Sequence, residues 1–129
     1  MKYYKLEKCD GFYWPLSYND EYLSMLVAIF TDGGSLDMVV KRELLNPEGR
    51  GATGNLTDVT IKGNTVIIQP AMFDVTDEPE EYAIEIDRDV LLDLINQWED
   101  LKKKKAKEIT FYRDEHNKIT VEGAFDEEK

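Results

Sequence analysis

Cysteine and histidine are almost missing from this 129-residue sequence, which has one of each, Cys9 and His116. A single cysteine excludes a disulfide within the chain, and a lone thiol is typical of a reducing cytoplasm. One cysteine and one histidine also cannot supply the usual nitrogen and sulfur ligands of a zinc ion. A histidine general base needs an oriented partner and a nucleophile within reach, which a turn residue such as His116 does not offer by sequence. We therefore expect a cytoplasmic protein that is not an enzyme and has no catalytic residue, metal or cofactor.

Long apolar runs are missing as well. The longest, at residues 22–30, is far shorter than the roughly 20 residues that cross a membrane. The first residues, Met-Lys-Tyr-Tyr-Lys-Leu-Glu, lack the apolar region of a signal peptide. The chain has no internal repeat and no linker rich in proline or glycine, and its length suits one domain. These features predict one acidic domain over residues 1–129, with a frayed tail after about residue 123.

Two patterns match the spacing of known ligand sites but lack the surrounding structure. Residues 49–54 contain glycines spaced as in a dinucleotide-binding loop, which needs a strand before it and a helix after it. Here a loop is predicted over residues 46–55, and a strand follows. The acidic stretch 74–85 has the length of a calcium-binding loop, but Pro79 stands where that loop needs glycine. Neither pattern predicts a ligand site.

Most of the chain predicts strands. Residues 2–6 alternate loosely between polar and apolar, and residues 82–87 alternate as a half-buried strand does. Two hairpins are predicted, one from residues 56–61 and 65–72 around Lys62-Gly63-Asn64, the other from residues 108–113 and 118–122. Pro70 cannot donate a ladder hydrogen bond, so its strand should end there or lie at an edge.

One long helix is predicted over about residues 88–106. Its apolar residues recur at helical spacing and form one stripe. Asp87 or Asp89 can cap its amino end, and Lys102 to Lys105 place positive charge near its carboxyl end. The stripe consists of Leu91, Leu94, Ile95, Trp98 and Leu101.

The amino-terminal third is harder to interpret. Residues 22–30 are apolar almost all round, so a buried strand and a buried helix both fit. A turn cluster at 31–35 and alternation over 36–41 favour a hairpin, with a helix as the alternative. Residues 9–19 contain many aromatic side chains and are interpreted as an irregular connection. We expect most of these side chains to pack in the core and fewer of them to form an interface. The predicted fold is α+β, a largely antiparallel sheet of hairpins with the long helix packed on one face.

Negative charge is abundant: 27 acidic residues against 16 basic ones give a net charge of −11. Such a surface repels phosphate backbones and anionic lipids, so we expect no direct binding to nucleic acid or membranes. The charge is concentrated between Asp74 and Asp93, where nine acidic residues accompany Arg88 alone, whereas Lys102 to Lys105 and Lys107 gather positive charge. A solvated, solubilising face explains this cluster, and so does a surface that binds a basic protein. The predicted contacts are Asp74, Asp77, Glu78, Glu80 and Glu81, with the pair Asp20 and Glu21 as a weaker candidate.

The carboxyl-terminal third adds a resemblance. The segments Tyr82-Ala-Ile-Glu-Ile-Asp87, Leu91-Leu-x-x-Ile-x-x-Trp98-Glu-x-Leu101, Glu108-Ile-Thr-Phe-Tyr112 and Lys118-Ile-Thr-Val121 are similar to the strand-helix-hairpin ends of several immunity proteins from bacterial polymorphic toxin systems, including contact-dependent growth inhibition. The resemblance implies a non-enzymatic cytoplasmic protein that binds a basic toxin domain, often a nuclease, and covers its active or substrate-binding surface. The acidic stretch would then stand in for phosphate charges. The alternatives are an accessory subunit of an intracellular complex, a nucleic-acid mimic that regulates a DNA-binding protein, and a small enzyme with an unfamiliar site.

Overall fold

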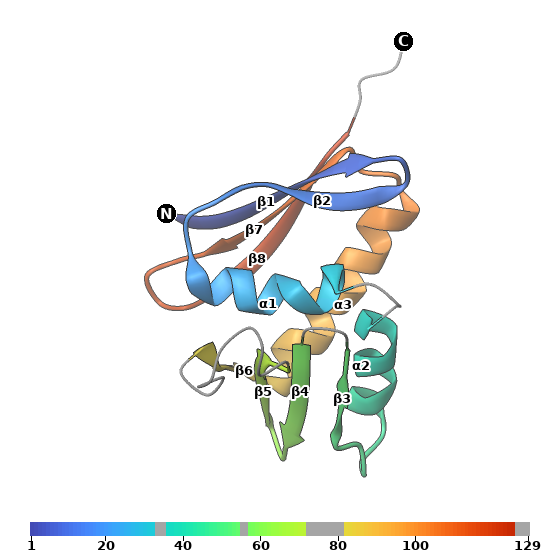
Figure 1. The fold of residues 1–129 in the computed structure, drawn as a ribbon, viewed down its shortest axis with the longest axis vertical. Helices are drawn as coiled ribbons and strands as arrows, with labels where there is room; N and C mark the ends of the chain where they lie inside the picture. The colour runs from blue at the N-terminus through green and yellow to red at the C-terminus, as the bar shows by residue number, and fades with distance from the viewer. Residues whose placement is uncertain (33–35, 55–56, 72–81, 126–129) are drawn as a thin grey trace. The chain divides into compact units, whose positions relative to one another are not determined.

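The computed structural model describes residues 1–32, 36–54, 57–71 and 82–125 (Figure 1). These residues form helices and antiparallel sheets, which confirms the α+β class. The chain divides into two compact units, unit 1 with residues 1–24 and 96–129, and unit 2 with residues 25–95. The boundaries fall inside two helices, α1 (Glu21–Thr31) and α3 (Arg88–Lys103). The single sheet expected from sequence is wrong, because each unit has a four-stranded sheet of its own.

Unit 1 brings the two ends of the chain together. Its sheet has the order β2-β1-β7-β8, with β1 at Lys2–Cys9, β2 at Phe12–Tyr18, β7 at Glu108–Arg113 and β8 at Ile119–Ala124. All neighbours are antiparallel, and β1 pairs directly with β7, far away in sequence. Figure 1 shows this as blue strands beside orange and red ones. The predicted first strand and the predicted carboxyl-terminal hairpin are confirmed.

Aromatic rings dominate the core of unit 1. The Trp98 ring of α3 lies 6.1 Å from the Phe111 ring and 5.3 Å from the Tyr13 ring, measured between centroids. Tyr13 also donates a 2.5 Å hydrogen bond from its hydroxyl to the carbonyl of Ala106. Trp98, Phe111 and Leu6 are fully buried, so this cluster joins the helix end to the sheet.

The irregular connection predicted over residues 9–19 is wrong, because most of it forms β2. The turn from β1 to β2 consists of Asp10 and Gly11, with φ of 53° and 84°. Positive φ at both central residues is what a two-residue hairpin turn needs, and an Asp-Gly pair supplies it. The number of aromatic residues in the segment obscured this signal. Pro15 fits because β2 is an edge strand, and a register shift opposite Lys5 and Leu6 marks a bulge.

Unit 2 contains the other sheet, in the order β3-β4-β5-β6. Its strands are β3 (Gly51–Thr53), β4 (Thr57–Lys62), β5 (Thr65–Pro70) and β6 (Ile84–Asp87), all antiparallel. The predicted hairpin around Gly63 is confirmed as β4 and β5, and β5 ends at Pro70 as expected. The predicted strand over 82–87 is confirmed for its last four residues, which form β6, whereas Tyr82 and Ala83 lie outside it.

The predicted hairpin over residues 22–41 is wrong: this segment forms α1 and α2 (Leu36–Leu45). In α2 the buried apolar residues Leu36, Val40 and Leu44 recur every four positions, while Met38 is half exposed. The alternation that favoured a strand therefore counted an exposed side chain as a buried one. In α1 the buried Leu23, Leu26 and Val27 also follow helical spacing.

The loop predicted over residues 46–55 is wrong in part, because β3 lies within it. Gly51 has a φ of 131°, and a Cβ atom there would overlap the carbonyl of Val59 on β4. This glycine therefore permits the close approach of two strands.

The long helix is confirmed, and it is shorter than predicted. Asp87 accepts a 2.9 Å hydrogen bond from the amide of Asp89, so it caps the amino end. At the other end, Lys105 takes a left-handed φ of 61°. Its amide donates to the carbonyl of Lys102, and the amide of Ala106 donates to that of Leu101, both at 3.0 Å. This is a Schellman motif, which ends the helix before residue 106 although no glycine marks the position.

Candidate functional site

An acidic surface lies where β6 joins α3 in unit 2. On β6, Glu85 and Asp87 are exposed and alternate with the buried Ile84 and Ile86. Asp89 and Asp93 on the first turns of α3 are exposed as well. We call Glu85, Asp87, Asp89 and Asp93 the acidic patch. Among the strands that the structure describes, β6 is the last of its sheet, so part of the patch lies at this end of the strand order.

Arg88, the basic residue inside this stretch, is held by backbone carbonyls. Its Nη2 donates to the carbonyls of Leu44 at 2.7 Å and Asn46 at 3.0 Å. Its Nη1 donates to the carbonyl of Gly63 at 3.2 Å, and its Nε to that of Leu44 at 3.3 Å. The guanidinium therefore fastens the end of α2 and the β4–β5 turn to the start of α3. Its donors serve this structural role within unit 2.

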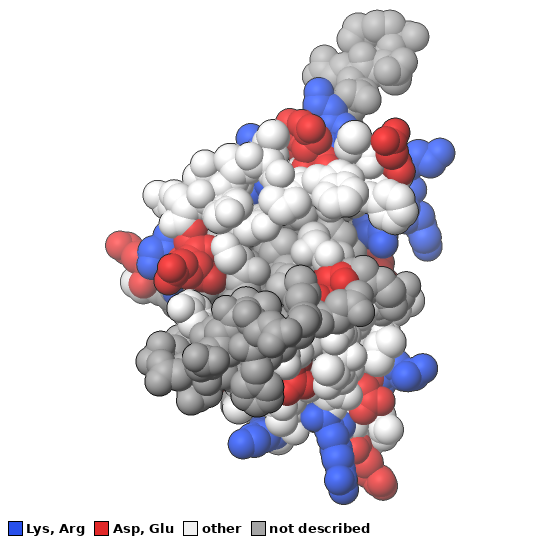
Figure 2. Space-filling view, viewed as in Figure 1, with Lys and Arg blue, Asp and Glu red and all other residues white. Residues whose placement is uncertain are grey.

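The two units differ sharply in charge. Unit 2 contains 14 acidic and 5 basic residues, whereas unit 1 contains 13 acidic and 11 basic ones. Unit 2 thus carries −9 of the total of −11, and unit 1 carries −2. Figure 2 shows the mixed charge of unit 1, where red and blue side chains lie next to one another around white ones. The acidity that dominates the composition is a property of unit 2.

The five predicted contacts, Asp74, Asp77, Glu78, Glu80 and Glu81, lie outside the residues that the structure describes. In sequence they precede the acidic patch directly, and they belong to unit 2. The weaker candidate pair is divided. Glu21 is exposed, but Asp20 is buried and bonded to arginine, so its carboxylate is not available to a partner.

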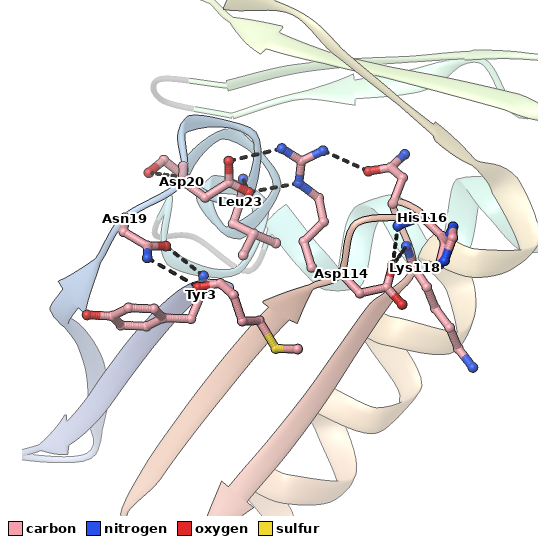
Figure 3. A network of polar contacts seen from close by, with 11 residues as sticks. Tyr3, Asn19, Asp20, Leu23, Asp114, His116 and Lys118 are labelled. Atoms are coloured by element: carbon pink, nitrogen blue, oxygen red, sulfur yellow. Dashed lines mark hydrogen bonds and ion pairs between the residues drawn. The ribbon is translucent and has the colours of Figure 1, made fainter.

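Asp20 instead forms a two-point ion pair with Arg113 in unit 1 (Figure 3). The Nε of Arg113 lies 2.8 Å from Oδ2 of Asp20, and Nη2 lies 3.0 Å from Oδ1. The remaining Nη1 donates to Asn117 at 2.9 Å, and the guanidinium lies 4.4 Å from the ring centroid of Tyr22. Burial alone would raise the pKa of Asp20, but the hydrogen bonds and charge of Arg113 outweigh it and hold that pKa below its usual value. The same bonds raise the pKa of Arg113.

The turn between β7 and β8 is fixed by Asp114. Its carboxylate accepts 2.8 Å hydrogen bonds from the amides of His116 and Lys118, as Figure 3 shows. These bonds lower the pKa of Asp114. His116 is exposed at the tip, as its predicted turn position implied. A shallow hollow of about 660 Å³ beside the turn is lined by Arg113, Asp114 and Met1, among others. The Arg113 side chain in this hollow is committed to Asp20, so we place no chemistry there.

A second surface feature is the strand β2, whose seven residues Phe12–Tyr18 we call the aromatic strand. Phe12, Trp14 and Tyr18 are exposed, whereas Tyr13 is half-buried against Trp98. Core packing, the commoner fate expected for these rings, holds for Tyr13 on Trp98 and in part for Tyr18, which stacks on the buried Tyr4, whereas Phe12 and Trp14 contact each other at the surface. The sequence shows where the aromatic residues lie along the chain, but it does not show on which face of a strand each side chain lies.

Within the described parts of the chain, no group of three histidine, cysteine, aspartate or glutamate side chains is arranged to hold a metal ion. In the same residues no single helix is long and apolar enough to cross a membrane, although the bent pair α1 and α2 together meets that length and composition.

Comparisons with protein-family models, with curated proteins and with solved structures gave no match.

Proposed function

We propose that this chain is a binding protein whose acidic unit 2 captures a basic protein domain, as an immunity protein captures its toxin. The charge difference between the units carries this proposal, because −9 of the net −11 belongs to residues 25–95. An acidic surface of this kind speeds association with a basic partner and disfavours acidic ones.

The hydrogen bonds of Arg88 also support an acidic binding surface on unit 2. A surface built only for solubility gains from mixed charges, since neighbouring opposite charges lower self-repulsion. In unit 2 the arginine within the acidic stretch bonds to the carbonyls of Leu44, Asn46 and Gly63. Arg88 is therefore directed at backbone carbonyls, while the four carboxylates of the acidic patch are exposed to solvent. An exposed acidic surface of this kind can stand in for the phosphates that a nuclease domain binds.

The second candidate is an accessory subunit or a nucleic-acid mimic that regulates a DNA-binding protein. A mimic would use the same acidic field and differ in its partner. A subunit packed through apolar side chains would depend on the aromatic strand, and its binding would respond little to salt. The experiment below separates these outcomes.

The test is affinity capture from a lysate of the source organism, washed at low and at high salt and analysed by mass spectrometry. Two charge-reversed variants accompany the wild type. One replaces Asp77, Glu78, Glu80 and Glu81 by lysine, and the other replaces Glu85 and Asp93. Asp87 and Asp89 stay unchanged, because a cation at the amino end of α3 would destabilise the helix. We expect a basic protein whose recovery falls with salt and is lost in the variants, and whose toxicity on expression is relieved by the wild-type chain.

The matched control is Glu115→Lys with Glu122→Lys, two exposed residues of unit 1. This control changes the net charge as much as the Glu85 and Asp93 variant does, so it separates a defined surface from overall charge. Recovery of a basic partner that is equal in all variants would contradict the proposal. A partner that is a DNA-binding regulator would favour the mimic, and a partner retained at high salt would favour the subunit.

A further inference from the structure

The aromatic strand places large apolar side chains at the open edge of the unit 1 sheet. Phe12, Trp14, Leu16 and Tyr18 are 67%, 56%, 48% and 57% exposed. The rings of Phe12 and Trp14 lie edge to face with centroids 6.5 Å apart, so they form one continuous apolar surface. None of the seven residues of β2 is charged. In Figure 2 the region over β2 is correspondingly white.

Edge strands of soluble proteins are normally protected by charges, prolines or bulges. β2 has the last two protections and lacks the first. Pro15 has no amide hydrogen, and the bulge opposite Lys5 and Leu6 interrupts the register. Both features oppose the addition of another strand. The exposed side chains, by contrast, are unprotected, so an occupant of this surface would contact side chains more than backbone.

We propose that the aromatic strand is a self-association surface, at which a second copy of this chain packs to form a two-fold dimer. In a two-fold interface the same patch of both copies is in contact, so the patch must not repel itself. Unit 1 meets this condition, because it carries −2 where unit 2 carries −9. This inference is independent of the proposed function.

Charge also argues against a basic partner at this position. Tyr13 of β2 donates its hydroxyl hydrogen bond to Ala106, which lies between Lys105 and Lys107. Lys8, opposite Tyr13 on β1, adds another positive charge. The lysines at the end of α3 therefore flank the aromatic strand and would repel a basic domain. Glu7, opposite Trp14 on β1, places a negative charge beside the same strand, so a two-fold copy can set its lysines against this carboxylate.

The apolar area suits a weak dimer. Phe12 and Trp14 share one face of the sheet, whereas Tyr18 stacks on Tyr4 on the other face, so with side chains of about 150–250 Å² each the two rings offer roughly 250 Å² per copy. Two copies would bury about 500 Å² of these rings, which together with a polar rim stays below the roughly 1,200 Å² of standard specific interfaces and suits a weak, transient dimer. We therefore expect a dissociation constant of about 10–100 µM, weaker than that of an obligate dimer.

Sedimentation equilibrium of the full chain over about 5–500 µM, a range that brackets this constant, tests the proposal. The mass should rise from 15.0 kDa to twice that value. Phe12→Ser with Trp14→Ser should raise the dissociation constant by at least about thirtyfold, as removal of two central aromatic contacts does. The control Met38→Ser with Leu45→Ser removes two apolar side chains that are 50% and 61% exposed on α2, and it should dimerise like the wild type.

Trp14 supplies a second measurement without any substitution. Trp98 is 2% exposed and Trp14 is 56% exposed, so acrylamide quenches mainly Trp14 in the monomer. Quenching should weaken as the protein concentration rises, and it should do so equally at low and high salt. A constant mass of 15.0 kDa with unchanged quenching would overturn the proposal. Dimerisation that survives in the Phe12 and Trp14 variant, or that is lost equally in the control, would overturn it as well.

Discussion

At the scale of single residues, Asp20 joins two structural roles in one side chain. Its carboxylate binds the Arg113 guanidinium at two points, and it also accepts a hydrogen bond from the amide of Leu23 at 3.4 Å. Its carbonyl accepts the first helical bond of α1, from Ser24 at 3.0 Å. Asp20 is therefore both the cap of the helix and the anion of the ion pair. Two substitutions separate these roles.

Asp20→Asn keeps a good capping side chain and removes the charge, whereas Asp20→Ala removes both. We expect a loss of about 2 kcal/mol in the free energy of unfolding for Asn, because the Arg113 side chain, only 17% exposed, loses its anion. We expect about 3 kcal/mol for Ala, because the cap is lost too. Urea denaturation at pH 7 measures both. Equal losses for Asn and Ala would mean that the cap contributes nothing.

The pH dependence follows from the lowered pKa of Asp20. A carboxyl with a lower pKa in the folded state stabilises the protein above its ordinary pKa of 3.8, and this stability is lost as the pH falls through the folded value. As the pH falls from about 5 through 3.8, the free energy of unfolding of the wild type should therefore decrease more than that of Asp20→Asn. Parallel pH profiles would show that the ion pair does not control acid stability.

At the scale of elements, the end of α3 carries an unfavourable residue. Lys105 has a left-handed φ of 61° in the Schellman motif, a conformation that glycine adopts without strain. Lys105→Gly should therefore raise the free energy of unfolding by about 0.5–1 kcal/mol. Lys103→Gly, which removes the same charge at the last residue of the helix, should lower it by up to about 1 kcal/mol. Urea denaturation compares the two variants, and a loss of stability in Lys105→Gly would contradict the helix end described here.

The sequence predicted the elements whose pattern was regular and whose turn chemistry was recognised. The β4–β5 hairpin, β6, α3 and the β7–β8 hairpin all follow from alternation or from an apolar stripe. The segment at 22–41 could not be predicted, because α1 is apolar on most sides and periodicity then carries no information. The strand β2 was not predicted, because the Asp10-Gly11 turn lies beside a run of aromatic residues and was not recognised as a hairpin turn. Pairing of β1 with β7, and the resulting division into two sheets, depends on contacts between distant residues, which local patterns do not encode.

The candidate sites also differed in how well they could be predicted from the sequence. The acidic stretch could be located there, because charged residues are identified by residue type alone. How the charge divides between the two units could not be predicted, because unit 1 is assembled from both ends of the chain. Asp20 illustrates the limit, since it looked like a surface acid and is buried beside Arg113, 93 positions away. The exposure of Phe12 and Trp14 likewise depends on β2 being an edge strand, which only the strand order reveals.

At the scale of the whole molecule, the net charge of −11 makes electrostatic repulsion a destabilising term. The largely buried ion pair of Asp20 with Arg113 is little screened by salt, whereas repulsion among exposed carboxylates is strongly screened. Salt should therefore stabilise this protein. The Debye length falls from about 30 Å at 0.01 M to about 8 Å at 0.15 M, so the change should be large over this range.

We expect the free energy of unfolding from urea denaturation to rise by about 1 kcal/mol between these two ionic strengths, a value on the scale of several exposed charge pairs. The variant with Asp77, Glu78, Glu80 and Glu81 changed to lysine is the control, because its smaller net charge should leave a much weaker salt dependence. If salt lowered the stability of the wild type, attractive surface pairs would outweigh the repulsion. The negative field of unit 2 would then be largely neutralised within the molecule, and the same result would weaken the case that it serves to attract a basic partner.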